Sequence, residues 1–234
     1  MKQDKDLTLL EKVELTDYLM GFLTAERREK FLSNIDLRTR HCTVVLEDIY
    51  QSHNASAVLR TCDCFGIQDV HIIENQNRYE VNQDVALGAS KWLTLHKYDT
   101  QEDNTVACLT WLKSKGYCIY ATTPHHDDVT PETIPLDNKI ALVFGTELQG
   151  LTATAMNLAD GFVKIPMFGF TESLNISVSA AIFMQNITSR LRKSNFPWKL
   201  SEPERSDVLL EWLKNSIKRS ELLIEDFMEK KQNH

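Results

Sequence analysis

Short apolar runs that alternate with segments of helical spacing constrain the fold of this 234-residue chain more than any other feature. Runs of about 4–8 apolar residues are typical of strands that are buried on both faces of a sheet. Such strand-like segments occur at residues 43–47, 70–73, 93–96, 117–120, 140–144 and 162–165. Because strands that alternate with helices form parallel sheets, the pattern predicts an α/β domain with a mainly parallel sheet.

The segments between these strands carry helical periodicity and capping residues. Asn54 is a good N-cap for a helix over residues 55–65, and Gly66 stands at the position of its C-cap. The other expected helices cover residues 7–32 (one or two helices), 82–89, 101–115, 174–192 and, as one last helix, 203–230.

Composition places the chain among ordinary globular proteins. A hydrophobic content of 42% is enough for a sizeable core, and the length favours one domain with helical additions. No apolar run approaches the ~18–20 residues that span a bilayer, and the charged start lacks the apolar stretch of a secretory signal. Five cysteines without a CxxC pair suit a reducing compartment. We therefore expect a cytoplasmic protein.

The net charge of −7 does not by itself indicate nucleic-acid binding, for which a basic surface is the usual sign. Local charge matters more than the net value, and basic residues gather at 27–30, 38–41 and 190–193. These clusters are either ordinary solvated helix faces or contacts to RNA. Charge alone leaves both interpretations open.

A doubly wound sheet suggests a nucleotide site, but the usual phosphate-binding loops are missing. The sequence contains neither GxGxxG after the first strand nor GxxxxGK[ST]. Polar residues instead cluster after three strands, where open α/β sheets bind ligands. In the first cluster, residues 53–61, Arg60 falls opposite the apolar stripe of its helix. It is either a solvent-facing partner of Asp63 or a functional residue.

The second and third clusters follow the strands at 140–144 and 162–165. Gly145 lets a backbone or a ligand approach closely, while Glu147 either contacts a ligand or serves the turn into a helix near Thr152. Ser173 or Asn175 caps the next helix, whose free amides suit a carboxylate or phosphate.

Together the three clusters resemble the signature motifs of the SPOUT superfamily, specifically the SpoU-type RNA 2′-O-ribose methyltransferases. The matching text is NASAVLRT at 54–61, ALVFGTELQGL at 141–151 and IPMFGFTESLNISVSAA at 165–181, within a resemblance over residues 40–195. The chain looks most like the tRNA guanosine-18 branch, which the segment at 88–92 also resembles. Gln149 departs from relatives that carry an aromatic residue there.

The resemblance implies a C-terminal trefoil knot, S-adenosylmethionine as methyl donor, tRNA as substrate and a homodimer with its site at the interface. It implies a division into an RNA-contacting extension (1–40), a methyltransferase domain (41–195) and a C-terminal extension (196–234). The implied catalytic residues are Arg60, Asn54, Glu147, Ser173 and Asn175. The implied donor-binding residues are Thr122, Gly145, Ile165, Met167 and Leu174. The tRNA-backbone candidates are Arg27, Arg28, Lys91, Arg190, Arg192 and Lys193.

Arg60 is often described in this family as the base that deprotonates the 2′-hydroxyl. A guanidinium stays protonated at neutral pH, which argues against that role. We hypothesise that Arg60 stabilises the developing alkoxide and grips the adjacent phosphate, which accepts the proton.

Other functions are weighed against this one. A SpoU enzyme for another tRNA position or for ribosomal RNA is the nearest alternative, and a non-catalytic RNA-binding module is a distant one. The missing glycine fingerprint disfavours a nucleotide-dependent oxidoreductase. The segment His125-His126-Asp127-Asp128 has no second group at ligand spacing, so we expect a solvated turn and no metal.

Overall fold

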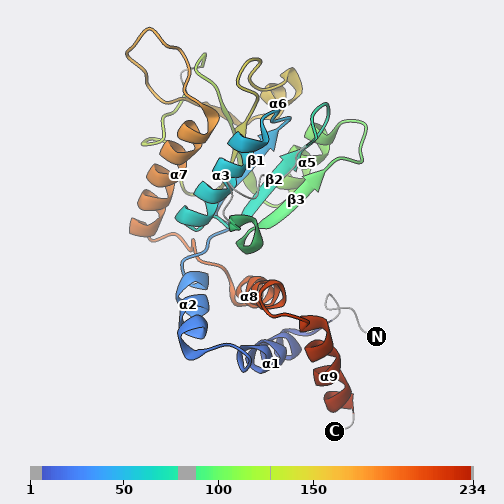
Figure 1. Ribbon diagram of the computed structural model, residues 1–234. Helices are drawn as coiled ribbons and strands as arrows, with labels where there is room; N and C mark the ends of the chain where they lie inside the picture. The colour runs from blue at the N-terminus through green and yellow to red at the C-terminus, as the bar shows by residue number, and fades with distance from the viewer. Residues whose placement is uncertain (1–6, 79–87, 127, 233–234) are drawn as a thin grey trace. The chain divides into compact units, whose positions relative to one another are not determined.

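The computed structural model describes residues 7–78, 88–126 and 128–232 (Figure 1). The chain divides into two compact units, one formed by residues 39–198 and one by the segments that precede and follow them. The larger unit contains the sheet, and the smaller unit is helical. Each unit is described by itself.

The sheet of the larger unit is parallel throughout the part of the chain that the structure describes. Its order is β3-β2-β1-β5-β4-β6. The strands are β1 (Cys42–Glu47), β2 (Asp69–Ile73), β3 (Thr94–Tyr98), β4 (Tyr117–Thr122), β5 (Lys139–Phe144) and β6 (Gly161–Val163). Each expected strand is present, shifted by at most two residues at either end, and the expected α/β class is confirmed.

Helices cover both faces of this sheet. They are α3 (Ser52–Phe65), η2 (Ala89–Trp92), α5 (Asn104–Ser114), α6 (Ala153–Leu158) and α7 (Ile176–Lys193). Helices α3 and α7 pack side by side on one face (Figure 1), while α5 and α6 share a second apolar cluster on the other face. Both faces are therefore buried, which explains why the strands are continuous apolar runs.

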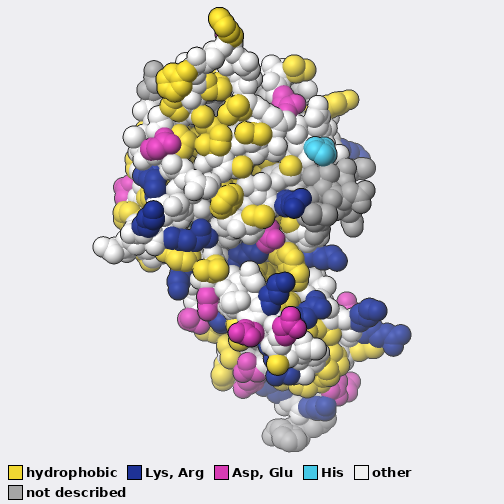
Figure 2. Space-filling view, turned by 60° about the vertical axis from the view of Figure 1, so that its left-hand side comes forward, with side chains coloured by type: hydrophobic (Ala, Val, Ile, Leu, Met, Phe, Trp, Pro, Cys, Tyr) yellow, Lys and Arg dark blue, Asp and Glu magenta, His cyan; other side chains and the backbone are white. Residues whose placement is uncertain are grey.

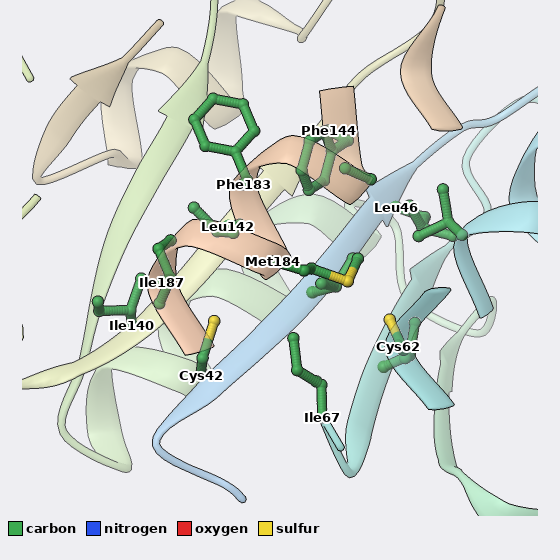
Figure 3. Close-up of a cluster of buried hydrophobic side chains, with 14 of the residues drawn as sticks. Cys42, Leu46, Cys62, Ile67, Ile140, Leu142, Phe144, Phe183, Met184 and Ile187 are labelled. Carbon is green, nitrogen blue, oxygen red and sulfur yellow. The ribbon is translucent and has the colours of Figure 1, made fainter. Parts of the chain in front are cut away.

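The main core lies between the sheet and the pair α3 and α7 (Figure 3). Phe144 of β5 meets Phe183 of α7 edge to face, with ring centroids 5.9 Å apart. Met184 and Ile187 of α7 are fully buried beside Leu142. Burial of one such side chain stabilises the fold by about 1.5–3 kcal/mol. This core fixes the start of α7 relative to the end of β5, where two of the polar clusters lie.

Helix α3 differs from the expectation at its start. It begins at Ser52, with Gln51 as N-cap, so the expected N-cap role of Asn54 is wrong. Asn54 lies in the first turn, where its side-chain amide donates to the side chain of Gln51, the N-cap residue, and to Glu147 of another segment. The C-cap expectation is confirmed, since Gly66 has a φ of 75°. Residues 82–87 of the helix expected over 82–89 lie outside the described residues.

The helical unit contains α1 (Leu9–Met20), α2 (Ala25–Ile35), α8 (Glu202–Ser216) and α9 (Ser220–Gln232). Helix α8 packs against α1, α2 and α9. The expectation of one last helix over 203–230 is wrong, because the chain breaks between α8 and α9. Arg219 has a φ of 56°, in the left-handed region, and the Ser220 hydroxyl donates to the Lys214 carbonyl. The N-terminal segment forms two helices, which was one of the two forms expected.

Two further observations concern the whole described chain. None of the described helices is both long enough and apolar enough to cross a membrane. All five cysteines are free thiols.

Candidate active site at the carboxyl edge of the sheet

Because all the strands are parallel, the loops that follow them emerge at one edge of the sheet. Ligands of open α/β sheets bind at this carboxyl edge. The first polar cluster follows β1, the second follows β5 and the third follows β6. Since β1 and β5 are neighbours in the sheet, their two loops meet directly.

Asn54, Glu147 and Asn175 form one hydrogen-bonded group at this edge. The Asn54 Nδ2 amide donates to Glu147 Oε1 at 2.8 Å, and the Asn175 Nδ2 amide donates to the same oxygen at 2.7 Å. Asn175 Nδ2 also lies 3.1 Å from Asn54 Oδ1. The fold thus brings together three of the expected catalytic residues, which are 28 to 121 positions apart in the chain.

Asn175 is held in place by its role as N-cap of α7. Its Oδ1 accepts the backbone N–H of Ser177 at 2.8 Å, which leaves the Nδ2 group to face Glu147. The expected alternatives of Ser173 or Asn175 as the cap are resolved in favour of Asn175. One side chain therefore both starts a helix and joins the polar group.

Glu147 sits in a closed turn after β5. Thr146 and Gly150 exchange two backbone hydrogen bonds, each 2.9 Å long. A Cβ at Gly145 would lie 2.2 Å from the Gly150 carbonyl oxygen, so only glycine allows this closure. Of the two partners expected to approach Gly145, a backbone or a ligand, the structure shows the backbone of Gly150.

Glu47 anchors the far end of the same loop and was missed in the sequence. Its buried carboxylate accepts from the Thr152 hydroxyl at 2.7 Å, the Thr152 N–H at 2.9 Å and the Thr105 hydroxyl at 2.7 Å. The bonds join β1 to the starts of α5 and α6. A carboxylate at the end of a buried apolar run was the signal that could have identified it, because buried charges need partners.

Asp48 is the second residue that was missed. Its Oδ1 accepts three backbone N–H groups, from Asn75 at 2.7 Å, Gln76 at 2.8 Å and Asn77 at 3.2 Å. Asp48 itself has a φ of 52°, a conformation that aspartate tolerates better than most residues. Its carboxylate fixes the loop after β2 against the loop after β1.

A cavity of about 230 Å³ opens between the loops after β1, β2 and β5. Such a volume lies below the ~300–1,000 Å³ of drug-sized ligand pockets, so it suits a single ring system rather than a whole cofactor. Its lining consists of Ile49, Tyr50, Gln51, Asn54, Gln76, Asn77, Thr146, Glu147, Leu148, Gln149 and Ile176. The polar group of Asn54 and Glu147 therefore faces a real hollow.

Arg60 and Ser173 are not part of this hydrogen-bonded group. Arg60 lies six residues beyond Asn54 on α3, about 9 Å further along the helix axis. Both side chains are exposed, and neither makes a hydrogen bond with the described residues. The alternative in which Arg60 pairs with Asp63 is not observed. Within the described residues, the N–H donors of Arg60 are therefore unoccupied.

The expected donor-binding residues lie on the other half of the edge, after β5, β4 and β6. The Thr122 hydroxyl at the end of β4 donates to the Val143 carbonyl at 2.8 Å, so it serves the sheet. Ile165 packs against the core, whereas Leu174 is 39% exposed. Residues 165–174 make no backbone hydrogen bond within the described chain. This half therefore offers unpaired main-chain groups beside apolar side chains, including that of Met167.

Several of the basic candidates are bound to backbone carbonyls. Arg28 donates to Leu23 and Gly21, Arg190 to Pro131 and Ile134, and Arg192 to Phe65. Arg27 lies over the ring of Phe31. Lys91 at the end of η2 and Lys193 at the end of α7 are exposed.

No group of three or more His, Cys, Asp or Glu residues is arranged to hold a metal within the described chain. Asp127 of the His-His-Asp-Asp segment lies outside the described residues. His126 stacks on Phe162 at 4.2 Å between ring centroids, and Asp128 accepts the Phe162 N–H at 3.0 Å.

Comparison with known proteins decides the family. The model of the SpoU rRNA Methylase family matches residues 41–185, which is more than half of the chain. The chain belongs to the SpoU rRNA methylase family. The resemblance seen in the sequence motifs is confirmed, and all five expected catalytic residues fall inside the matched segment.

Three SpoU relatives indicate the branch. A tRNA (guanosine(18)-2′-O)-methyltransferase of Borreliella burgdorferi is 43% identical over 205 residues, covering 88% of this chain and 92% of that protein. An enzyme of the same name from Thermus thermophilus is 31% identical over 193 residues, covering 82% and 97%. The structure of the A. aeolicus TrmH/SpoU tRNA modifying enzyme matches with a TM-score of 0.72 at 28% identity, covering 82% of this chain and 98% of that one.

Proposed function

We propose that this SpoU chain transfers a methyl group from S-adenosylmethionine to the ribose 2′-hydroxyl of guanosine-18 in the D-loop of tRNA, in the cytoplasm. The observation that carries the proposal is the group of Asn54, Glu147 and Asn175 beside a cavity, in a chain 43% identical to an enzyme of that name. Membership of a methylase family supports the reaction, and the named relatives support the substrate.

The surface after β4, β5 and β6 fits a methyl donor of this kind. Adenine and ribose need hydrogen bonds at their edges and apolar contact on the ring faces. Residues 165–174 offer main-chain groups without partners in the described chain, and Ile165, Met167 and Leu174 offer apolar surface. Gly145 directly follows β5, and Thr122 ends the neighbouring strand β4. When bound, the donor supplies an electrophilic methyl group on a sulfonium cation.

The acceptor ribose is positioned by the side chains of the polar group. Asn54 and Asn175 both donate to one oxygen of Glu147, so Glu147 Oε2 is left to accept a hydrogen bond from a sugar hydroxyl. Positioning accounts for most of the acceleration in such a transfer, because the two reacting atoms must meet in line. Ser173, two residues before Asn175, lines the approach.

Arg60 stabilises the alkoxide that forms at the ribose and holds the adjacent phosphate. Its guanidinium makes no hydrogen bond with the described residues, so its donors are available for a bidentate contact. The phosphate then accepts the 2′-hydroxyl proton.

The proposed assembly is a homodimer whose site lies at the interface. Leu174, Val178 and Ile182 follow one another at spacings of four residues along α7 and its N-terminal extension, and all three are more than a third exposed. In Figure 2, where the side of α7 comes forward, hydrophobic side chains gather over this part of the larger unit. Apolar patches of this kind mark interaction sites. The segment after β6, which also exposes Phe168 and Phe170, belongs to the proposed trefoil knot.

The proposal keeps the functional division of the chain at residues 40 and 195. The extension before residue 40, η2 and the basic end of α7 hold the tRNA backbone. The residues are Arg27, Arg28, Lys91, Arg190, Arg192 and Lys193. The carbonyl contacts of Arg28, Arg190 and Arg192 fix these guanidiniums in place, and each keeps further N–H donors for a phosphate.

The description of the family as rRNA methylases favours one second candidate, a ribose of ribosomal RNA. The same polar group and the same donor surface serve that reaction, so the two candidates differ only in the RNA that is held.

The test is transfer of labelled methyl from S-adenosylmethionine to unmodified tRNA transcripts, followed by nucleoside mapping. We expect 2′-O-methylguanosine at position 18 with the wild-type protein. Arg60→Ala lowers the rate by at least ~100-fold, because removal of one charged transition-state donor costs about that much. Arg219→Ala, at the break between α8 and α9, is the matched control and keeps wild-type activity. Methylation of ribosomal RNA alone selects the second candidate, and no transfer to either RNA refutes the proposal.

A further inference from the structure

The cavity beside Asn54 and Glu147 has a lining that is rich in side-chain amides. Gln51, Gln76, Asn77 and Gln149 join Asn54 around it, and Glu147 is the sole charged side chain among the described lining residues. With no Lys, Arg or His in that lining, the cavity does not favour a phosphate. Its chemistry instead suits a neutral group that both donates and accepts hydrogen bonds.

The amide of Gln76 is available to such a group. Its side chain is exposed and makes no hydrogen bond with the described residues. Asn77 is partly used, because its Nδ2 donates to the Asp48 carbonyl at 2.9 Å while its Oδ1 remains open. Gln51 accepts from Asn54 through Oε1 and keeps its own Nε2 donor. Side-chain donors and acceptors are therefore both available around this cavity.

The backbone that carries Gln76 is held firmly although its side chain is not. The Asp48 carboxylate accepts the N–H groups of Asn75, Gln76 and Asn77, and hydrogen bonds to a charged acceptor are among the strong ones. Asn75 is tied further to α5, since its Oδ1 accepts the Asn104 N–H at 3.0 Å. Two anchors therefore fix the position from which Gln76 reaches into the cavity.

Tyr50 completes the cavity with an aromatic ring that is 79% exposed. Unstacked RNA bases bind proteins by stacking on such rings, with hydrogen bonds on their Watson–Crick edges. The Watson–Crick edge of guanine presents the O6 acceptor and two donors, N1–H and the 2-amino group, whereas the edge of adenine presents one acceptor and one donor. The side-chain oxygens of Gln76 and Asn77 supply two acceptors for the donors of guanine, and Gln76 Nε2 supplies the donor for O6.

We propose that this cavity holds the base of the target nucleoside, and that Gln76, positioned by Asp48, is the residue that reads its guanine edge. The inference rests on the proposed function, because Asn54 and Glu147 must place the ribose of the same nucleoside at the mouth of the cavity. It adds to that function the residues which select guanine over adenine.

The experiment compares kcat/KM for tRNA transcripts with guanosine or adenosine at position 18, using wild type and Gln76→Ala. We expect the preference of wild type for guanosine to fall by about 10-fold or more in the variant, as for loss of one base-reading side chain. The KM for S-adenosylmethionine stays unchanged. Asn138→Ala is the matched control, since Asn138 is an exposed amide just before β5, at the opposite edge of the sheet. An unchanged preference in Gln76→Ala overturns the inference.

A second measurement keeps the inference testable if the proposed function fails. Guanosine is titrated into the full-length wild-type protein, and the Gln76 side-chain amide is followed by NMR, with adenosine as the comparison. A shift with guanosine that exceeds the shift with adenosine supports the base site, even if tRNA is not methylated. Methylation of tRNA without any guanosine-dependent shift or change in preference overturns the base site and leaves the proposed function intact.

Discussion

Glu47 and Asp48 show how two adjacent carboxylates organise the site in different directions. Glu47 binds the hydroxyls of Thr105 and Thr152, whereas Asp48 binds the backbone of residues 75–77. They bind different partners because Glu47 ends the extended strand, whereas Asp48 turns the chain in the left-handed conformation, with a φ of 52°. A single dipeptide at the end of β1 therefore fixes both the loop that carries Glu147 and the loop that carries Gln76.

His71 makes stability depend on pH. It is buried and stacked on His96 with ring centroids 4.5 Å apart, and Tyr98 Oη lies 3.2 Å from its Nδ1. Burial lowers the pKa of His71 to about 3, the charge of His96 acts in the same direction, and Asp69 opposes both. The unfolded chain therefore takes up a proton between about pH 6.5 and pH 3 that the folded chain does not bind.

The free energy of unfolding is expected to fall as the pH is lowered from 7 to 5, with a slope that approaches ~1.4 kcal/mol per pH unit from His71. His71→Gln removes this contribution, while His53→Gln, at an exposed histidine, keeps it. Urea denaturation at pH 7, 6 and 5 measures the slopes. Equal slopes in wild type and His71→Gln would contradict the burial argument.

At the residue scale, the sequence could identify candidates but not their contacts. Asn54, Glu147 and Asn175 were expected at strand ends, and the parallel order of β1 and β5 then brings them together. The N-cap prediction for Asn54 failed because a tertiary bond to Glu147 competes with a local cap. Asp48 was missed because its carboxylate binds backbone N–H groups, and such contacts leave no pattern in the side chains of the sequence. Gln76 was missed with it, because Asp48 is what positions the backbone of Gln76.

At the scale of an element, the turn after β5 depends on glycine at position 145. In Gly145→Ala the new Cβ meets backbone atoms of Gly150 at 2.2 and 2.3 Å, and neither end of this clash is a flexible side chain. We expect a loss of about 1–3 kcal/mol, as for overpacking. At roughly 3 °C per kcal/mol the Tm falls by ~3–9 °C. Methyl transfer falls as well, since the turn carries Glu147.

Thermal unfolding followed by circular dichroism measures this loss. Gly169→Ala is the matched control for stability, because its Cβ would meet only the Thr171 nitrogen, at 4.0 Å. Its Tm is expected to stay within about 1 °C of wild type, as for a surface substitution. Equal Tm values in the two variants would show that the turn opens at no cost.

Elements were predicted well where a local pattern decides them. The strands followed from apolar runs, and the end of α3 followed from Gly66, which adopts the left-handed conformation of a C-cap. The break between α8 and α9 was missed, because Arg219 adopts that conformation without being glycine. Residues 165–174 have no regular structure and no internal periodicity, so only the motif resemblance drew attention to them.

The whole sheet separates two tasks along one edge. Loops after β2, β1 and β5 surround the amide-lined cavity. The residues expected to bind the methyl donor follow β5, β4 and β6. The turn after β5 belongs to both halves, and it carries both Gly145 and Glu147. A strand order in which β5 lies between β1 and β4 therefore sets the amide-lined cavity on one side of this turn and the proposed methyl-donor surface on the other. Neither this order nor a knot follows from composition or periodicity.

The proposed dimer predicts that a charge on the exposed face of α7 separates the protomers. Val178 on α7 is 46% exposed and Val106 on α5 is 42% exposed, so the two valines differ mainly in the face they occupy. Val178→Asp must desolvate a carboxylate without a partner in an apolar interface, which costs several kcal/mol, whereas Val106→Asp stays in water. Sedimentation should give wild type and Val106→Asp twice the mass of one chain, and Val178→Asp that of one chain.

Methyl transfer should follow the same pattern, because a site at the interface needs both protomers. Val178→Asp is expected to lose activity at concentrations where it is monomeric and to regain part of it as the concentration is raised, since mass action restores the dimer. Val106→Asp keeps wild-type activity at every concentration. A monomeric wild type with full activity would place the entire site, including Arg60, within one chain. In that case the nucleotide itself would have to span the distance of about 9 Å along α3 that separates Asn54 from Arg60.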